Sequence, residues 1–177
     1  KEWEGSRDRR TFKTGAPVPP PDLKYNQSHE PVLQQEAAVG HAVRAVYMYS
    51  AMADLAREAG DQELLKSCRR LWDNIASKQL YITGGIGATH NGEAFTFAYD
   101  LPNDTAYAET CASIGLIFFA HRMLQMDMDS RYGDVMERAL YNVVLGSASR
   151  DGKRFFYVNP LEVWPKACGG NPDKQHV

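Results

Sequence analysis

The residues best suited to chemistry lie in one stretch of the chain, from Gly84 to Ser113. Its sequence, GGIGATHNGEAFTFAYDLPNDTAYAETCAS, contains a histidine, two glutamates and a cysteine, which are His90, Glu93, Glu109 and Cys111. Imidazole, carboxylate and thiol groups serve in proton transfer, nucleophilic attack and zinc binding. The glycines favour a loop that leads into a helix. The stretch therefore predicts a functional site.

Glu109 and Cys111 are separated by one residue. On a regular helix this spacing places the two side chains about 200° apart. In an extended segment, or across a helix start, they can point the same way. A carboxylate and a thiol that converge would supply half of a tetrahedral zinc site. The alternative is that Cys111 is a small buried hydrophobic residue.

Glu93 lies in the sequence GEAF and is a candidate for proton transfer. A carboxylic acid that protonates a leaving group near neutral pH needs its pKa raised by an apolar or anionic setting. The neighbouring Ala94, Phe95 and Phe97 would provide an apolar one. The alternative is a loop glutamate that caps a nearby backbone amide.

Several motifs resemble glycoside hydrolase family 127, the β-L-arabinofuranosidase family. They are GGIG, GEAF, DLPNDTAYAETCAS, AVGHAVRAVY and MERALYN, and the likeness runs from about Gln27 to Tyr157. The resemblance implies an all-α fold, an incomplete (α/α)6 toroid, and retaining hydrolysis of terminal non-reducing β-L-arabinofuranosides. Members of the family are several times longer, and the chain starts at Lys1 without a methionine. We therefore expect an internal fragment of the catalytic domain.

The resemblance also implies a zinc cofactor and the roles of individual residues. Glu93 matches the general acid/base, and Glu109 and Cys111 match two zinc ligands. The family's other ligands are a Cys-Cys pair, one member of which is the nucleophile. Cys168 is isolated and does not match that pair, so we expect the nucleophile beyond the chain end. Glu93 and Glu109 could otherwise be read as the two carboxylates of an ordinary glycosidase.

The resemblance further implies an oligosaccharide or glycan as the substrate. His41 and Tyr157 match residues that contact the sugar, and His29 and His90 are expected at the rim of the site. The alternative for His41 is a hydrogen-bonded core histidine. Tyr157 lies in a strand-like segment, where aromatic residues usually belong to the core.

Two other functions stay open. Toroids of this type also host sugar epimerases and isomerases, in which His41, His90 and His121 would have to converge; we otherwise expect His121 to be packed within its helix. A non-catalytic carbohydrate-binding remnant is favoured if the natural chain stops near Val177, because it would lack a nucleophile.

Hydrophobic periodicity predicts where the helices lie. Residues 1–32 are proline-rich and should be irregular, and residues 33–177 should form part of the α/α barrel. We expect helices over 33–59, 62–78, 105–126 and 131–145, with Asn103 and Asp104 as cap candidates for the third. Short strand-like segments are expected at 80–83 and 154–158.

The faces of these helices alternate. The first and third helices carry apolar residues on two sides, whereas the second and fourth each carry a single apolar stripe. Alternating interior and exterior helices are what a double ring requires, whereas a plain helical bundle does not need them.

Composition excludes some partners. The net charge of −2 over 177 residues argues against a nucleic-acid surface, which needs a clustered basic excess. No apolar run approaches the roughly 20 residues of a membrane helix, so we expect no membrane partner. The three cysteines are widely spaced and predict no disulfide framework, and we interpret Cys68 as structural. Free thiols favour the cytoplasm, and a periplasmic or extracellular location stays open.

Overall fold

The computed structural model describes residues 22–163, and helices dominate this part of the chain. Its four α-helices are α1 (Ala42–Ala59), α2 (Gln62–Lys78), α3 (Thr110–Met126) and α4 (Ser130–Ala139). A 3-10 turn, η1 (Asn91–Glu93), lies between α2 and α3, and α4 continues into a π-helical turn, η2 (Leu140–Val144). The strands β1 (Gly40–His41) and β2 (Ala94–Phe95) form one short antiparallel pair. The predicted all-α fold is confirmed, and Cys168 lies outside the described residues.

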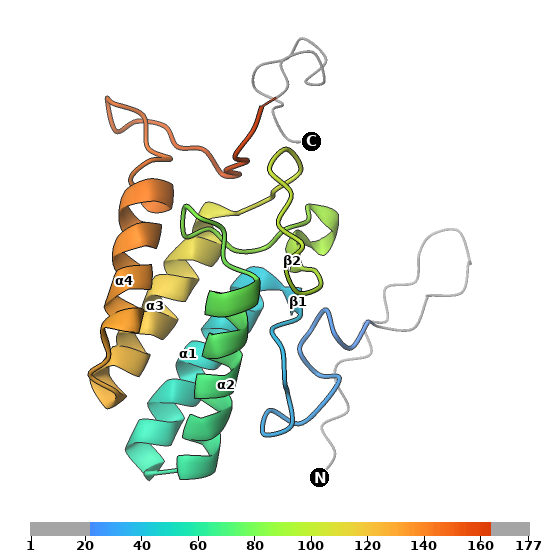
Figure 1. The fold of residues 1–177 in the computed structure, drawn as a ribbon, viewed down its shortest axis with the longest axis vertical. Helices are drawn as coiled ribbons and strands as arrows, with labels where there is room; N and C mark the ends of the chain where they lie inside the picture. The colour runs from blue at the N-terminus through green and yellow to red at the C-terminus, as the bar shows by residue number, and fades with distance from the viewer. Residues whose placement is uncertain (1–21, 164–177) are drawn as a thin grey trace.

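The helices form an inner pair, α1 and α3, and an outer pair, α2 and α4, and Figure 1 shows how they are arranged. The inner helices α1 and α3 pack against each other, α2 packs against α1, and α4 packs against α3. Trp72 of α2 joins the layers, because its ring lies 5.6 Å from that of Phe119 in α3 and 4.8 Å from that of Tyr132 in α4. This packing confirms the predicted alternation of interior and exterior helices.

The helix predicted over 62–78 is confirmed at both ends. Gly60 ends α1 in a left-handed conformation, with φ of 66°, which glycine adopts without a steric penalty. The Asp61 carboxylate then caps α2 by accepting a hydrogen bond from the Leu64 amide at 3.0 Å. Both signals lie within a few residues of the boundary that they set.

Two predicted helix starts were wrong. The first helix begins at Ala42, nine residues later than expected, because Gly40 and His41 form β1 and their backbone groups pair with β2. The third helix begins at Thr110, and its N-cap is Glu109, whereas Asn103 and Asp104 do not cap it. The preceding backbone stays out of the helix because Ala108 donates to the Gly87 carbonyl at 2.9 Å.

The predicted strand-like segments form no sheet in the described chain. The first segment runs into a turn over residues 81–84, which is closed by a hydrogen bond from the Gly84 amide to the Tyr81 carbonyl. In residues 154–158, Phe155 makes a single isolated bridge to Ala148. Since neither segment finds a neighbouring strand in the described chain, its aromatic and β-branched residues do not form a sheet.

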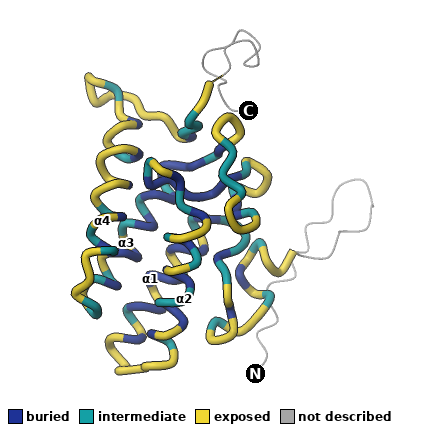
Figure 2. Tube along the Cα trace, in the orientation of Figure 1, coloured by how far each residue is buried: buried dark blue, intermediate teal, exposed yellow. Residues whose placement is uncertain are grey.

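One end of the helices carries the loops. The starts of α1 and α3 lie at this end, together with β1, β2, the α2–α3 connection and the chain after η2 (Figure 1). Buried residues lie where the helices face one another, and exposed residues lie along the outer sides of α2 and α4 (Figure 2). No helix in residues 22–163 is long and apolar enough to cross a membrane.

Candidate active site

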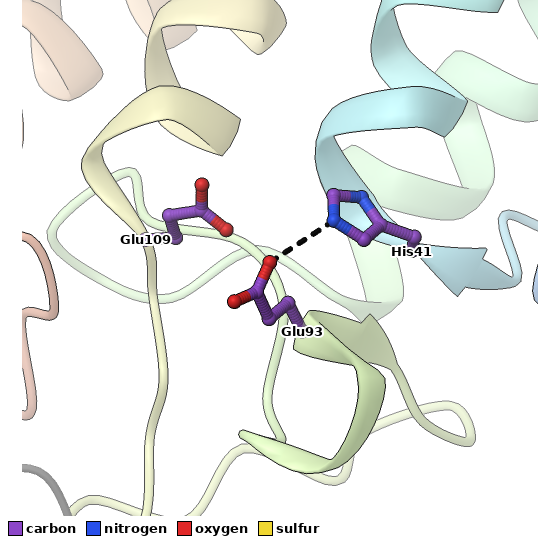
Figure 3. Close-up of side chains that lie close together, drawn as sticks. All are labelled: His41, Glu93 and Glu109. Atoms are coloured by element: carbon purple, nitrogen blue, oxygen red, sulfur yellow. Dashed lines mark hydrogen bonds and ion pairs between the residues drawn. The ribbon is translucent and has the colours of Figure 1, made fainter. Parts of the chain in front are cut away.

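Glu93 projects from the turn η1 beside the start of α1. Gly92 and Glu93 both adopt left-handed backbone conformations, with φ of 70° and 52°. The chain then enters β2, where Ala94 pairs with His41. This pairing places the Glu93 Oε2 atom 3.0 Å from the His41 Nε2 atom (Figure 3). A non-glycine residue at positive φ is typical of functional sites, since surrounding contacts must hold it there.

His41 makes two hydrogen bonds, one through each ring nitrogen. The Arg44 amide donates to Nδ1 at 3.3 Å, so His41 also caps α1. Because Nδ1 accepts, the ring proton of the neutral imidazole lies on Nε2, which donates to Glu93. The buried side chain of Gln27 supports the backbone here by donating to the carbonyls of Val39 at 2.9 Å and His41 at 3.4 Å.

Tyr107 is a second donor to Glu93. Its hydroxyl lies 3.0 Å from Glu93 Oε1. Burial, followed by the carboxylate of Glu93, raises the pKa of the phenol above its ordinary value, so the hydroxyl stays protonated. Tyr107 is not among the site residues predicted from the sequence. Its position two residues before Glu109 was the available signal, because residues at this spacing in an extended segment share a face.

Glu109 and Cys111 converge at the start of α3. Glu109 is 2% exposed, and its Oε1 atom accepts hydrogen bonds from the Cys111 thiol and, at 2.6 Å, from the Tyr157 hydroxyl. Burial, followed by the hydrogen bond to Glu109, raises the pKa of the Cys111 thiol to about 11. The two side chains meet because Glu109 is the N-cap and Cys111 lies in the first helical turn.

These two residues fit a zinc ion. The second carboxylate oxygen of Glu109, Oε2, is buried and has no hydrogen-bond partner in the described chain. An unpaired buried carboxylate oxygen is costly unless a cation or donor compensates it. A carboxylate and a thiol are ligands that zinc accepts. Ligand atoms of His41, Glu93 and Glu109 also lie within 4.8 Å of one another (Figure 3), so the two halves of the site adjoin.

Tyr157 joins this cluster from the chain after η2. Its carbonyl accepts from the Thr110 amide at 2.9 Å, and the Asn159 side chain donates to the Ala108 carbonyl at 2.9 Å. These bonds fix residues 157–159 beside the segment that carries Glu109. The Tyr157 side chain is 39% exposed, so it is not the buried core residue of the alternative interpretation.

The other histidines stay outside the cluster within residues 22–163. His90 is exposed and makes no side-chain cap to η1. His29 is half-buried in the loop before β1, and its Nδ1 atom has no partner in the described chain. His121 is exposed on α3, so the expected packing was wrong. Phe97 is 73% exposed, which leaves Ala94 and Phe95 as the apolar neighbours of Glu93.

Comparisons with known proteins match this chain and its fold. The profile of the β-L-arabinofuranosidase, GH127 catalytic domain matches residues 6–175. A non-reducing end β-L-arabinofuranosidase from Bifidobacterium longum subsp. longum is 47% identical over 153 residues, which cover 86% of this chain and 23% of that protein. The crystal structure of a GH127 β-L-arabinofuranosidase from Geobacillus stearothermophilus superimposes with a TM-score of 0.82 at 61% identity.

That structure is matched over 87% of this chain and 24% of its own. A second solved structure, of a GH127 β-arabinofuranosidase, gives a TM-score of 0.76 at 55% identity, over 78% of this chain and 22% of that one. The chain thus spans about a quarter of the length of these relatives. The expected partial α/α toroid is confirmed, and the chain belongs to the GH127 β-L-arabinofuranosidase catalytic-domain family.

Proposed function

We propose that the complete enzyme is a retaining glycoside hydrolase that removes terminal non-reducing β-L-arabinofuranose from an oligosaccharide or glycan. The names of its GH127 relatives support this substrate. The observation that carries the proposal is the convergence of Glu93, His41 and the Glu109–Cys111 pair, which come from separate segments of the chain.

In this proposal Glu93 is the general acid/base. Its side chain is about one-third exposed, at 35%, so it can reach a substrate while His41 holds one of its oxygens. Glu93 would give a proton to the glycosidic oxygen as the bond to the leaving group breaks, and it would later take a proton from the water that releases the sugar. His41 would fix the carboxyl group and lie beside the bound sugar, and Tyr157 would line the same site.

Glu109 and Cys111 would hold zinc, with the remaining ligands and the nucleophilic cysteine supplied by parts of the enzyme outside this chain. A bound zinc ion keeps coordinated thiols deprotonated at neutral pH. This chain's contribution is to hold the carboxylate and the thiol together, with Tyr157 donating to Glu109 as an outer partner that fixes its orientation.

Burial argues against Glu109 as the nucleophile of a two-carboxylate mechanism. A nucleophile must contact the anomeric carbon, whereas Glu109 is 2% exposed and its free oxygen is fully buried. The carboxylate instead faces the Cys111 thiol and the Tyr157 hydroxyl. This surrounding suits a metal ligand better than an attacking group.

The geometry favours hydrolysis over the epimerase and isomerase alternative. An acid and a base made from histidines would need His41, His90 and His121 on one site. In residues 22–163 the histidine within the site cluster is His41, and its partner there is a carboxylate. Release of free arabinose from a glycoside, with no interconversion of free sugars, is the expected reaction.

Substitution of the proposed acid tests this function. In the complete enzyme, Glu93→Gln should lower turnover of natural glycans by about 100- to 10,000-fold, since general acid–base catalysis contributes that much. Aryl glycosides with good leaving groups should be affected much less. Turnover close to that of the wild type on both substrates would refute the role of Glu93.

Metal analysis tests the zinc half of the proposal. Zinc content of the complete enzyme should fall in Glu109→Ala and in Cys111→Ala, because each removes one ligand. Cys68→Ala is the matched control, since Cys68 is buried in the helical core, and zinc content should be unchanged. Wild-type zinc content in both ligand variants, measured by inductively coupled plasma mass spectrometry, would remove the metal assignment.

A further inference from the structure

Glu93 is held at both of its carboxyl oxygens by donors from different parts of the chain. The His41 imidazole lies 3.0 Å from Oε2, and the Tyr107 hydroxyl lies 3.0 Å from Oε1. With one donor on each oxygen, the plane of the carboxyl group is fixed in addition to its position. Removal of either donor leaves that plane free to rotate.

The two donors differ once Glu93 carries a proton. In the tautomer that the Arg44 amide selects, His41 Nε2 can only donate. The hydroxyl of Tyr107 donates to a carboxylate and, after rotation about its C–O bond, accepts from a carboxylic acid. Tyr107 can therefore keep its hydrogen bond to Glu93 whichever oxygen carries the proton, whereas His41 keeps its own only while Oε2 is unprotonated.

The fold places Tyr107 independently of Glu93. Its backbone amide donates to the Ala88 carbonyl at 3.3 Å, and its carbonyl accepts from the Asn159 amide at 3.2 Å. The ring packs edge-on against that of Tyr157, with centroids 6.3 Å apart and planes at 76°. Because these backbone bonds and the ring contact fix Tyr107, its hydroxyl stays in position whether Glu93 is protonated or ionised.

We propose that Tyr107 is a positioning residue for Glu93, keeping the carboxyl group aimed at the leaving-group oxygen before and after proton transfer. The inference rests on the proposed acid/base role of Glu93. Proton transfer requires heavy atoms to approach within about 3 Å, so a carboxyl group that can rotate reaches the oxygen less often. In the cycle the proton moves between Glu93 and the substrate, and Tyr107 returns to its starting state.

Tyr107→Phe in the complete enzyme tests the inference, because it removes the hydroxyl and keeps the ring against Tyr157. The substrates are methyl and 4-nitrophenyl β-L-arabinofuranoside, whose leaving groups do and do not need protonation. We expect kcat/KM to fall by about 10- to 100-fold on the methyl glycoside and by less than about 3-fold on the nitrophenyl glycoside. The parameter kcat/KM reports the steps up to and including cleavage of the glycosidic bond.

Two variants separate this role from others. Glu93→Gln should show the same preference for the nitrophenyl glycoside in a stronger form. Tyr81→Phe removes a buried hydroxyl that donates to the Pro102 carbonyl at 3.2 Å, outside the cluster. As a control for a purely structural effect, this variant should change kcat/KM by the same factor on both substrates.

The outcomes distinguish the inference from the proposed function. The positioning role is overturned if Tyr107→Phe lowers kcat/KM equally on both substrates, or on neither, while Glu93→Gln still lowers it selectively on the methyl glycoside. The acid/base assignment then stands. If Glu93→Gln is itself unselective, the acid/base assignment falls and the inference falls with it. Selective loss in both variants, with equal change in Tyr81→Phe, supports both.

Discussion

Cys68 and Cys111 are thiols whose surroundings differ. Cys68 lies fully buried within the apolar core on α2, and burial alone accounts for the rise of its pKa to about 12. Cys111 is half-buried beside a carboxylate, and both features raise the pKa of its thiol, whereas a bound cation would lower that pKa. Residue type alone therefore does not assign these cysteines, and their neighbours do.

Cys68 should consequently resist alkylation in the native complete enzyme. At pH 8 its thiol stays protonated, because the pKa near 12 lies well above that pH, and the thiolate is the reactive form. Treatment with iodoacetamide followed by peptide mass spectrometry should find Cys68 unmodified, and modified after denaturation in urea. Equal modification in the native and denatured enzyme would contradict this assignment.

Sequence patterns predicted the residues of the cluster better than its hydrogen bonds. Glu93, Glu109, Cys111 and His41 were identified from motifs, whereas the contact of Tyr107 with Glu93 was missed. That contact depends on where the chain after Leu101 turns back against residues 87–88, which is set by backbone pairing between distant segments. A motif records residue types and does not record such pairings.

Helices α1 and α3 approach each other closely at Gly115. A Cβ atom at this position would lie 2.5 Å from the Cγ2 atom of Val46 in α1. Val46 is fully buried and β-branched, so its side chain has few other rotamers available. The close packing of α1 against α3 therefore requires glycine at position 115. The site lies at the start of both helices, so its geometry depends on this packing.

Gly115→Ala should destabilise the enzyme. Overpacking costs about 1–3 kcal/mol, and the better helix propensity of alanine offsets up to about 1 kcal/mol of that cost. Gly133→Ala is the matched control in α4, where no heavy atom lies within 4 Å of the added Cβ, and it should be neutral or stabilising. Chemical denaturation of the complete enzyme measures the free energy of unfolding of both variants. If Gly115→Ala is as stable as Gly133→Ala, the close contact between Gly115 and Val46 is refuted.

Elements were predictable where their boundaries depend on nearby residues. The limits of α2 follow from Asp61 and a single apolar stripe, and both are visible in the sequence. The start of α3 depends on Ala108 bonding to Gly87, twenty-one residues earlier, so local propensity placed the start too early. The start of α1 was misplaced for the same reason, since β1 pairs with a strand that follows α2.

At the scale of the whole molecule, this chain is about a quarter of the length of its relatives. Its inner helices expose large apolar side chains, such as Tyr47 at 47% and Phe118 at 43%, whose rings pack edge-on 6.1 Å apart. Exposed contiguous apolar surface is typical of faces that other parts of a protein cover. The chain is thus best understood as one sector of a larger ring.

The isolated 177-residue chain should bind zinc weakly and have no glycosidase activity. In the proposed site it would supply two of four zinc ligands, Glu109 and Cys111, so we expect affinity far below that of the complete enzyme. Equilibrium dialysis against a zinc buffer measures this affinity. Nanomolar binding by the isolated chain would show that other residues complete the metal site.

The two bonds of His41 have a consequence for how a sugar is received. Its planar ring is held at two edges, by the Arg44 amide in the first turn of α1 and by Glu93, so it cannot rotate without breaking both hydrogen bonds. In the proposed function, an arriving sugar would meet a polar surface that is already oriented, so little binding free energy would be spent on rearranging it. A substitution that loosens the start of α1 should therefore weaken sugar binding, even when it changes no group that touches the sugar.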